Sequence, residues 1–309
     1  MKFAFVFPGQ GSQSVGMMAA YGDVLRETFV EASDALGLDL WDLVTGGPAE
    51  ALNQTVNTQP AMLTAGVSVW RLWQQRGGAM PALMAGHSLG EYTALACAGA
   101  LGFADAVRLV RLRAEAMQTA VPEGVGAMAA VLGLGDDAVR ALCAEAAQGE
   151  VLEAVNFNSP GQVVIAGHKA AVDRGCALAK EKGAKRALPL PVSVPSHCAL
   201  MKPAAEKLAA ALADIEIKPP AVPVLHNADV AAYTDPAAIR DALARQLYMP
   251  VRWVETVQDM GRQGIQLIAE CGPGKVLAGL NKRILEGVPT LAVTDGASLD
   301  EVLARSRGN

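Results

Sequence analysis

Short apolar runs alternate along the chain with longer stretches in which apolar residues recur every three or four positions. The short runs are typical of buried strands and occupy residues 2–7, 82–86, 221–227, 264–272 and 289–293. The longer stretches predict helices and include residues 60–77, 91–101 and 104–121. Strands that alternate with helices in this way predict an α/β fold with a largely parallel sheet.

The segment from residue 124 to residue 193 carries a different pattern, in the order strand, helix, strand, strand, helix, strand. We expect its strands at residues 125–134, 151–157, 162–167 and 185–192. We expect its helices at residues 136–148 and 169–183. A βαββαβ order within about seventy residues is that of the ferredoxin-like unit, so this segment predicts a small inserted subdomain.

The composition supports a large buried core. Of the 309 residues, 51% are hydrophobic and 18% are charged, which argues against an intrinsically disordered chain. The formal net charge is −5, so we expect no nucleic-acid partner, and an anionic partner would need a local basic patch.

The cysteines and the apolar runs indicate the cellular compartment of the protein. The five cysteines are scattered and form no C-x-x-C pair, which argues against a disulfide framework and against a zinc site. The apolar start of the chain ends at Pro8, too early for a signal peptide, and no apolar run approaches the roughly eighteen residues of a membrane span. We therefore expect a cytoplasmic protein with no membrane partner.

Residues 86–92 read "GHSLGEY" and place Ser88 between two glycines. Ser88 and Glu91 match a helix capping box, in which the serine only satisfies backbone N–H groups. Gly-x-Ser-x-Gly is also the nucleophile elbow of acyl-transfer enzymes, a sharp strand-to-helix turn that needs small residues on both sides of the serine. Because Gly90 would cost an ordinary helix about 1 kcal/mol relative to alanine, the glycines favour a nucleophile over a simple cap.

A nucleophilic serine needs a base, and the chain has four histidines. His87 adjoins Ser88, and an elbow would point it away from the serine. His168 follows a strand of the small subdomain and is expected in an exposed turn, while His226 ends an apolar strand and is typical of a structural histidine. His197 lies in a proline-rich stretch that leaves the subdomain, and it is the best remaining candidate for the base.

The helix expected at residues 104–121 carries an arginine on its apolar face. Ala106, Val110 and Met117 form an apolar stripe at helical spacing, and Arg113 falls on it. An arginine on a buried face needs an anionic partner. That partner is either a carboxylate of the protein, in a salt bridge, or the carboxylate of a substrate, held by the two arms of the guanidinium.

The loop after the first strand, "GQGS" at residues 9–12, begins like a dinucleotide-binding fingerprint. The fingerprint needs a third glycine where Ser14 stands, so that interpretation fails. The alternative is a tight loop that lends a backbone N–H group to the oxyanion hole of the elbow.

Eight stretches of the chain, in order, resemble one family, the malonyl-CoA:acyl-carrier-protein transacylases of bacterial fatty-acid synthesis. They are "FVFPGQGSQ", "NTQPA", "GHSLGEY", "RLRAEAMQ", "NFNSPGQVVIAG", "PVSVPSHCALM", "QLYMPVRW" and "ECGPGKVLAGL". The likeness covers essentially the whole chain. It implies an α/β-hydrolase-like catalytic core formed by residues 1–123 and 194–309, with the ferredoxin-like subdomain inserted at residues 124–193.

The resemblance implies a role for each residue that matches a family motif. Ser88 would be the nucleophile that carries the acyl group, and His197 would be its base. The backbone N–H groups of Gln10 and Leu89 would form the oxyanion hole. Gln246 would orient His197 through its backbone carbonyl oxygen.

The resemblance also implies the substrates. Malonyl-CoA would be the donor and acyl carrier protein the acceptor, with a malonyl-serine ester between them and ping-pong kinetics. Arg113 would bind the malonyl carboxylate, Met117 would contact the substrate, and Asn158 would lie near the acyl or pantetheine group. We expect no metal and no redox cofactor, and we expect a monomer.

Three other interpretations remain open. The same enzyme could serve polyketide synthesis as a separate acyltransferase. A thioesterase of the α/β-hydrolase class would use water as acceptor, but such enzymes place an acidic residue between serine and histidine and their histidine late in the chain. A non-catalytic module that binds carrier protein would have no need of Ser88, His197 and Arg113 together.

Overall fold

A computed structural model of the chain describes residues 1–192 and 194–307. Its main sheet has the strand order β7-β2-β1-β8-β9, and each neighbouring pair is parallel. The strands are β1 (Phe3–Phe7), β2 (Leu83–Gly86), β7 (Val224–Leu225), β8 (Leu267–Cys271) and β9 (Thr290–Val293). The predicted α/β fold with a largely parallel sheet is confirmed.

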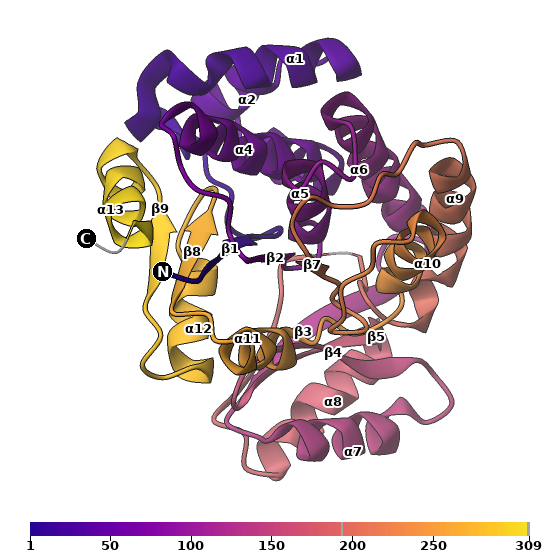
Figure 1. Cartoon of the computed structure of the whole chain (residues 1–309). Helices are drawn as coiled ribbons and strands as arrows, with labels where there is room; N and C mark the ends of the chain where they lie inside the picture. The colour runs from indigo at the N-terminus through magenta and orange to yellow at the C-terminus, as the bar shows by residue number, and fades with distance from the viewer. Residues whose placement is uncertain (193, 308–309) are drawn as a thin grey trace.

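Helices cover both faces of this sheet (Figure 1). They are α4 (Thr55–Gln75), α5 (Gly90–Cys97) and α6 (Phe103–Gln118) on one face, and α11 (Trp253–Arg262) and α12 (Val276–Ile284) on the other. Phe3, Phe5 and Phe7 of the central strand β1 pack on the first face, whereas Ala4 and Val6 pack on the second. A strand covered on both faces needs a continuous apolar run, which is what the sequence provides.

The other helices outside the inserted segment form an outer layer around the core. They are η1 (Ala19–Leu25), α1 (Arg26–Leu36), α2 (Leu40–Gly46), α3 (Ala49–Leu52), η2 (Ala199–Met201), α9 (Lys202–Ala213), α10 (Pro236–Gln246) and α13 (Gly296–Ser306). In Figure 1, α1 lies over α4, α9 lies beside α6 with α10 next to it, and α13 lies along the edge strand β9. Helix α10 ends at Gln246, whose side chain donates a hydrogen bond of 2.9 Å to the backbone oxygen of Ser88.

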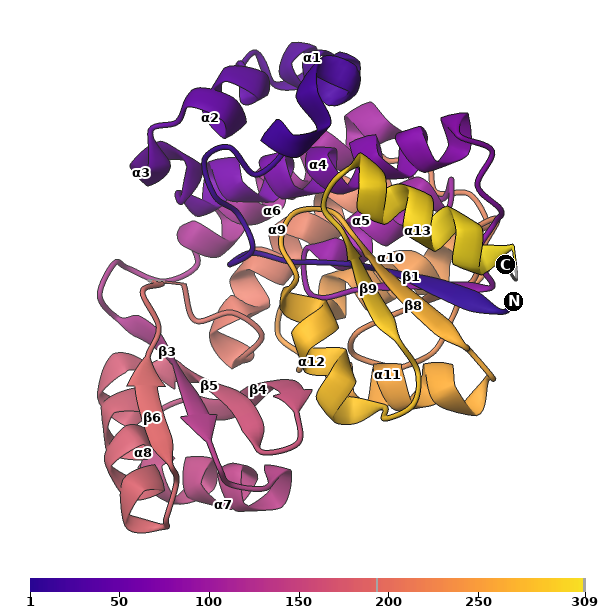
Figure 2. The same cartoon turned by 90° about the vertical axis from the view of Figure 1, so that its left-hand side faces the viewer.

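The inserted segment forms a separate antiparallel sheet in the order β4-β5-β3-β6 (Figure 2). Its strands and helices are β3 (Gly126–Leu132), α7 (Asp136–Ala147), β4 (Leu152–Ser159), β5 (Gln162–His168), α8 (Lys169–Glu181) and β6 (Arg186–Pro189). This is the predicted βαββαβ unit with ferredoxin-like strand order. The boundaries at residues 123/124 and 193/194 stay predictions, and Ser193 and residues 308–309 lie outside the described residues.

Several elements differ in extent from the sequence prediction, and α4 and β7 differ most. Helix α4 begins at Thr55 rather than at residue 60, so Pro60 lies inside it. The proline has no N–H group for the carbonyl oxygen of Val56, and that oxygen instead accepts a hydrogen bond of 3.1 Å from Arg111. Strand β7 has two residues rather than the seven at 221–227, because the chain turns away after Leu225 toward the site described below.

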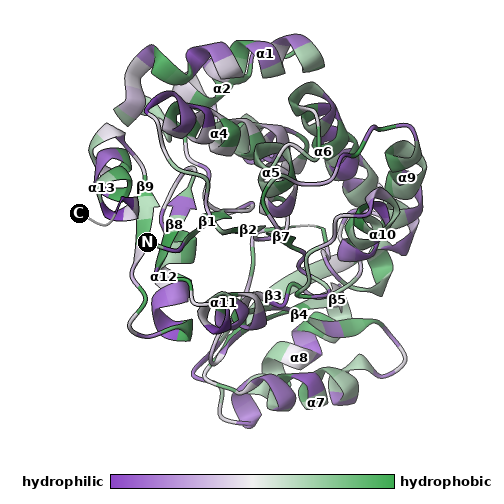
Figure 3. Ribbon diagram, viewed as in Figure 1, coloured by the Kyte–Doolittle hydropathy of each residue, from purple (hydrophilic) through white to green (hydrophobic). Residues whose placement is uncertain are grey.

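The most buried helix of the core is also mostly hydrophobic, and the exposed helices are more hydrophilic. Helix α5 is buried almost throughout, and Figure 3 shows it mostly in the hydrophobic colours, whereas the outer helices carry hydrophilic stretches. Among the helices that the structure describes, none combines the length and the apolar character needed to cross a bilayer.

Candidate active site

A cavity of about 140 Å³ lies between the main sheet and the subdomain. It opens at the carboxyl ends of β1 and β2, the edge where ligands of parallel α/β sheets bind. Ser88, His197 and Arg113 are among its polar lining residues. Met128 and Leu190 contribute to its apolar side, so both parts of the fold line it.

Ser88 lies on a sharp turn between β2 and α5. Its φ angle is 50°, in the left-handed region that non-glycine residues rarely adopt. A side chain on Gly86 would place its Cβ 1.8 Å from the carbonyl carbon of Gly90, and one on Gly90 would place its Cβ 2.1 Å from the oxygen of Phe7. Both flanking glycines are therefore required for the turn to close, as an elbow demands.

The capping-box interpretation of Ser88 and Glu91 is wrong. A cap residue has extended backbone angles, and the positive φ of Ser88 excludes them. The N–H group of Ser88 donates to Oδ1 of Asn227 over 2.7 Å, and the Glu91 carboxylate accepts from Asn227 and Gln246 instead of reaching back to Ser88. The serine side chain is left free to face the cavity.

His197 faces Ser88 across the cavity. Its Nε2 atom lies 2.8 Å from Ser88 Oγ, and its Nδ1 atom lies 2.8 Å from the backbone oxygen of Gln246. Because that carbonyl can only accept, Nδ1 carries the proton and Nε2 presents its lone pair to the serine hydroxyl. The loop that carries His197 is held in place by a hydrogen bond of 3.0 Å from its N–H group to Leu247.

The other three histidines have different partners. His87 lines the same cavity, but its Nε2 atom pairs with Oδ1 of Asn158 at 2.8 Å rather than with the serine. His226 is buried, and its Nδ1 atom lies 2.7 Å from the Glu91 carboxylate. His168 ends β5, where Nδ1 accepts a backbone N–H group. Of the four, His197 is the one that contacts the hydroxyl of Ser88.

Arg113 is buried, with 1% of its surface exposed, and its guanidinium points at the serine. It donates to the side-chain oxygens of Gln59 at 2.8 Å and Gln246 at 3.1 Å, and to Ser88 Oγ at 3.2 Å. Within residues 1–192 and 194–307 no carboxylate pairs with it and its Nε atom has no hydrogen-bond partner. The salt bridge to a protein carboxylate is therefore wrong, and the cation has a place for an external anion.

Two backbone N–H groups border the cavity beside Ser88. Gln10 follows β1 and is fixed by a hydrogen bond of 3.1 Å from its side chain to Thr55, and Leu89 precedes the first turn of α5. In the described part of the chain neither N–H group has an acceptor. Both are thus available to an oxyanion at the site, and the N-terminus of α5 adds its favourable dipole.

The remaining predicted residues lie near the cavity in different ways. Met117 lines it, and its sulfur accepts a hydrogen bond of 3.7 Å from Gln59. Asn158 is not among the lining residues but binds His87, which is, whereas Asn156, two residues earlier on β4, lines the cavity directly. Gln59 lies within the motif "NTQPA", which was the one signal in the sequence that pointed to it.

This combination of fold and site defines the class of acyl transferases. The acyl transferase domain family matches residues 4–293 of the chain. A relative from Salmonella typhimurium (strain LT2), named malonyl CoA-acyl carrier protein transacylase, is 62% identical over 307 residues, which cover 98% of this chain and 99% of the relative. The chain belongs to this transacylase family.

Two solved structures extend the comparison. An acyl-carrier-protein S-malonyltransferase from Burkholderia pseudomallei 1710b is 63% identical, with a TM-score of 0.97 over 98% of this chain and 100% of that one. A malonyl-transacylase solved in complex with its type II PKS acyl-carrier protein is 56% identical, with a TM-score of 0.97 over 99% of this chain and 100% of that one.

Proposed function

We propose that the protein transfers a malonyl group from malonyl-CoA to the phosphopantetheine thiol of acyl carrier protein, through a malonyl ester on Ser88. The observation that carries the proposal is the buried Arg113 guanidinium, which has no protein carboxylate in the described residues and lies 3.2 Å from Ser88 Oγ. The family to which the chain belongs supports the same substrates.

In the first half-reaction Ser88 Oγ attacks the thioester carbon while Nε2 of His197 takes the hydroxyl proton. The carbonyl oxygen becomes an oxyanion, which the N–H groups of Gln10 and Leu89 stabilise. The carbon–sulfur bond then breaks, the CoA sulfur takes the proton from His197, and the malonyl group stays on the serine. Gln246 holds the imidazole in the required tautomer through its backbone oxygen.

In the second half-reaction the thiol of the carrier protein attacks the ester. His197 takes the thiol proton and returns it to Ser88 Oγ as the ester bond breaks, which restores the free enzyme. Because CoA leaves before the carrier protein reacts, the kinetics are ping-pong. Proton transfer and charge stabilisation are both supplied by side chains and N–H groups, so neither half-reaction calls for a metal or a redox cofactor.

A single copy of the chain supplies every residue of this mechanism, which supports a monomer. The five free, buried cysteines support a reducing cytoplasmic setting. The acceptor is a carrier protein of fatty-acid synthesis, as the family indicates. The likeness to a transacylase solved with a type II PKS acyl-carrier protein makes a polyketide carrier protein the second candidate acceptor.

Intact-protein mass spectrometry tests this function. After incubation with malonyl-CoA, we expect an adduct of one malonyl group on the wild-type protein and none on Ser88→Ala. We expect holo acyl carrier protein to discharge the adduct much faster than water does. An absent adduct, or discharge by water at the same rate as by the carrier protein, would contradict the transferase and favour a docking module or a thioesterase, respectively.

The pH dependence of acylation provides a second prediction. Burial, and secondly the nearby Arg113 cation, lower the pKa of His197 from 6.5 to about 3. Since the base must be neutral to accept the serine proton, it stays active as the pH falls well below 6.5. We expect kcat/KM for malonyl-CoA to remain flat from about pH 8 to about pH 5, measured in a single buffer of constant ionic strength. An inflection near pH 6.5 would show that His197 is not depressed in the free enzyme.

A further inference from the structure

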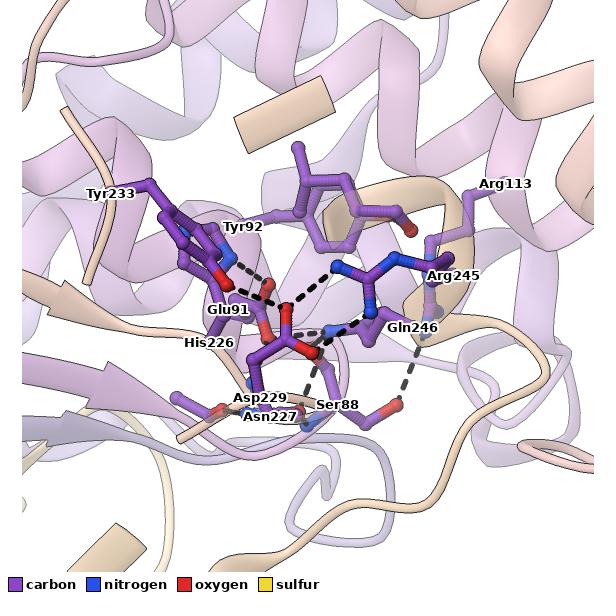
Figure 4. Close-up of polar contacts among 12 residues, drawn as sticks. Ser88, Glu91, Tyr92, Arg113, His226, Asn227, Asp229, Tyr233, Arg245 and Gln246 are labelled. Atoms are coloured by element: carbon purple, nitrogen blue, oxygen red, sulfur yellow. Dashed lines mark hydrogen bonds and ion pairs between the residues drawn. The ribbon is translucent and has the colours of Figure 1, made fainter. Parts of the chain in front are cut away.

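Glu91 is a buried carboxylate that the mechanism above does not use. It lies on the first turn of α5, three residues after Ser88, and it is fully buried. Its two oxygens accept hydrogen bonds from Nδ1 of His226 at 2.7 Å, the N–H group of Asn227 at 2.8 Å and Nε2 of Gln246 at 3.0 Å (Figure 4). A carboxylate buried in this way is tolerated only because donors from separate segments converge on it.

Two of these donors belong to residues that hold the reacting groups. Gln246 binds His197 through its backbone oxygen, and its side chain also contacts the backbone oxygen of Ser88 at 2.9 Å and the Arg113 guanidinium at 3.1 Å. Asn227 binds the N–H group of Ser88 at 2.7 Å, and it donates to the oxygen of Gly86 at 2.6 Å. Only one residue, Gln246 or Asn227, therefore separates the Glu91 carboxylate from the nucleophile, its base and the guanidinium.

The two segments that supply these donors are also joined to each other. Arg245 precedes Gln246 at the end of α10, and it forms a bidentate pair with Asp229 at 2.8 and 2.7 Å. Asp229 lies two residues after Asn227, and it also accepts from the hydroxyl of Tyr233 (Figure 4). This outer pair keeps the segments side by side, so that their inner residues reach one carboxylate.

We propose that Glu91 is the positioning residue of the catalytic centre. Its carboxylate fixes Asn227 and Gln246 relative to α5, and through them it sets the distance between Ser88 Oγ and Nε2 of His197. The inference rests on the proposed function for its activity readout. It does not involve contact with substrate, since Glu91 is not among the residues that line the cavity.

Glu91→Gln tests the proposal with almost no change in volume. If the new amide nitrogen faces Asn227 and Gln246, their donors lose an acceptor, and if it faces His226, the imidazole must move its proton from Nδ1 to Nε2 in order to accept. In both orientations the hydrogen bonds from Asn227 and Gln246 lose the carboxylate charge that strengthens them. We expect the single-turnover rate constant for malonylation of Ser88 at saturating malonyl-CoA to fall about 100-fold, as a displacement of about 1 Å at a reacting centre does. The half-saturating concentration of malonyl-CoA should stay within about threefold of the wild-type value.

Glu270 offers a matched control. It is also a fully buried carboxylate, and it accepts backbone N–H groups of Leu277 at 3.1 Å and Ala278 at 2.8 Å, away from Ser88 and His197. Glu270→Gln should lower the thermal midpoint of unfolding at least as much as Glu91→Gln does, yet leave the acylation rate within about threefold. Equal rate losses in the two variants would overturn the positioning role.

A spectroscopic readout separates this proposal from the proposed function. The Nδ1 proton of His197, assigned in the NMR spectrum with His197→Ala, reports the hydrogen bond to Gln246 without any turnover. Its resonance should move in Glu91→Gln and stay in place in Glu270→Gln, and an unmoved resonance in both would overturn the proposal.

If Glu91→Gln does not fold, Glu91→Asp decides by the same criteria. It keeps the carboxylate but shortens the side chain by one methylene group, and we expect about a 10-fold rate loss. A wild-type protein that takes no malonyl group would instead contradict the proposed function.

Discussion

Replacing His197 with alanine should lower the rate of malonylation of Ser88 by about four orders of magnitude, the upper range for a general base. The geometry supports a value at that end of the range. The Nε2 atom lies 2.8 Å from Ser88 Oγ, and among the described histidines it is the only ring nitrogen that reaches this hydroxyl. Because burial and the Arg113 cation lower the pKa of His197, the imidazole is neutral at neutral pH and able to accept the serine proton. Rapid-quench mass spectrometry of the Ser88 adduct measures the effect.

His168→Ala is the control for this prediction. It removes a histidine on the subdomain, at the end of β5, where the ring only accepts a backbone N–H group. Acylation by His168→Ala should stay within about threefold of the wild-type rate, since the two sites share no partner. A loss of less than about tenfold in His197→Ala would mean that another group takes the serine proton, with His87, which lines the same cavity, the first to test next.

The parts of the site that could be predicted are those encoded locally. The elbow is contiguous, and each of its glycines has a steric reason that can be inferred from the motif: Gly86 and Gly90 have no room for a Cβ. Arg113 was identified by helical periodicity, which places a charge on an apolar stripe before any tertiary contact is known. The backbone angle of Ser88 was not encoded in this way, because the same letters also satisfy a capping box.

The parts that could not be predicted depend on how distant segments meet. The sequence pattern placed Asn227 at the end of a seven-residue strand, but the chain leaves the sheet after Leu225 and carries the asparagine to the serine. Glu91 has the appearance of an ordinary acidic residue in a first helical turn, and only its convergence with Gln246 and Asn227 gives it another role. Polar residues in loops have no periodicity, so nothing in the chain itself pairs them before the strand order is known.

The same reasoning gives Arg113→Ala a large and specific effect on substrate selection. In the wild-type protein a malonyl carboxylate would satisfy a guanidinium that is buried among Gln59, Gln246 and Tyr92, whereas an acetyl group would leave it without an anion. Removing the guanidinium reverses the balance, because the malonyl carboxylate would then be buried unpaired. We expect the ratio of acylation rates for malonyl-CoA over acetyl-CoA to fall about 150-fold, which corresponds to about 3 kcal/mol.

The ratio is the appropriate measurement because Arg113 also touches Ser88 Oγ and Gln246, so its loss lowers both rates to some extent. Arg108→Ala removes a charge on the exposed side of the same helix and should leave the ratio unchanged. Arg113→Lys keeps the charge but not the planar fork, and it should give an intermediate ratio. If the ratio in Arg113→Ala equals that of the wild type, the carboxylate does not bind this guanidinium. The preference for a malonyl group would then have to come from elsewhere in the cavity.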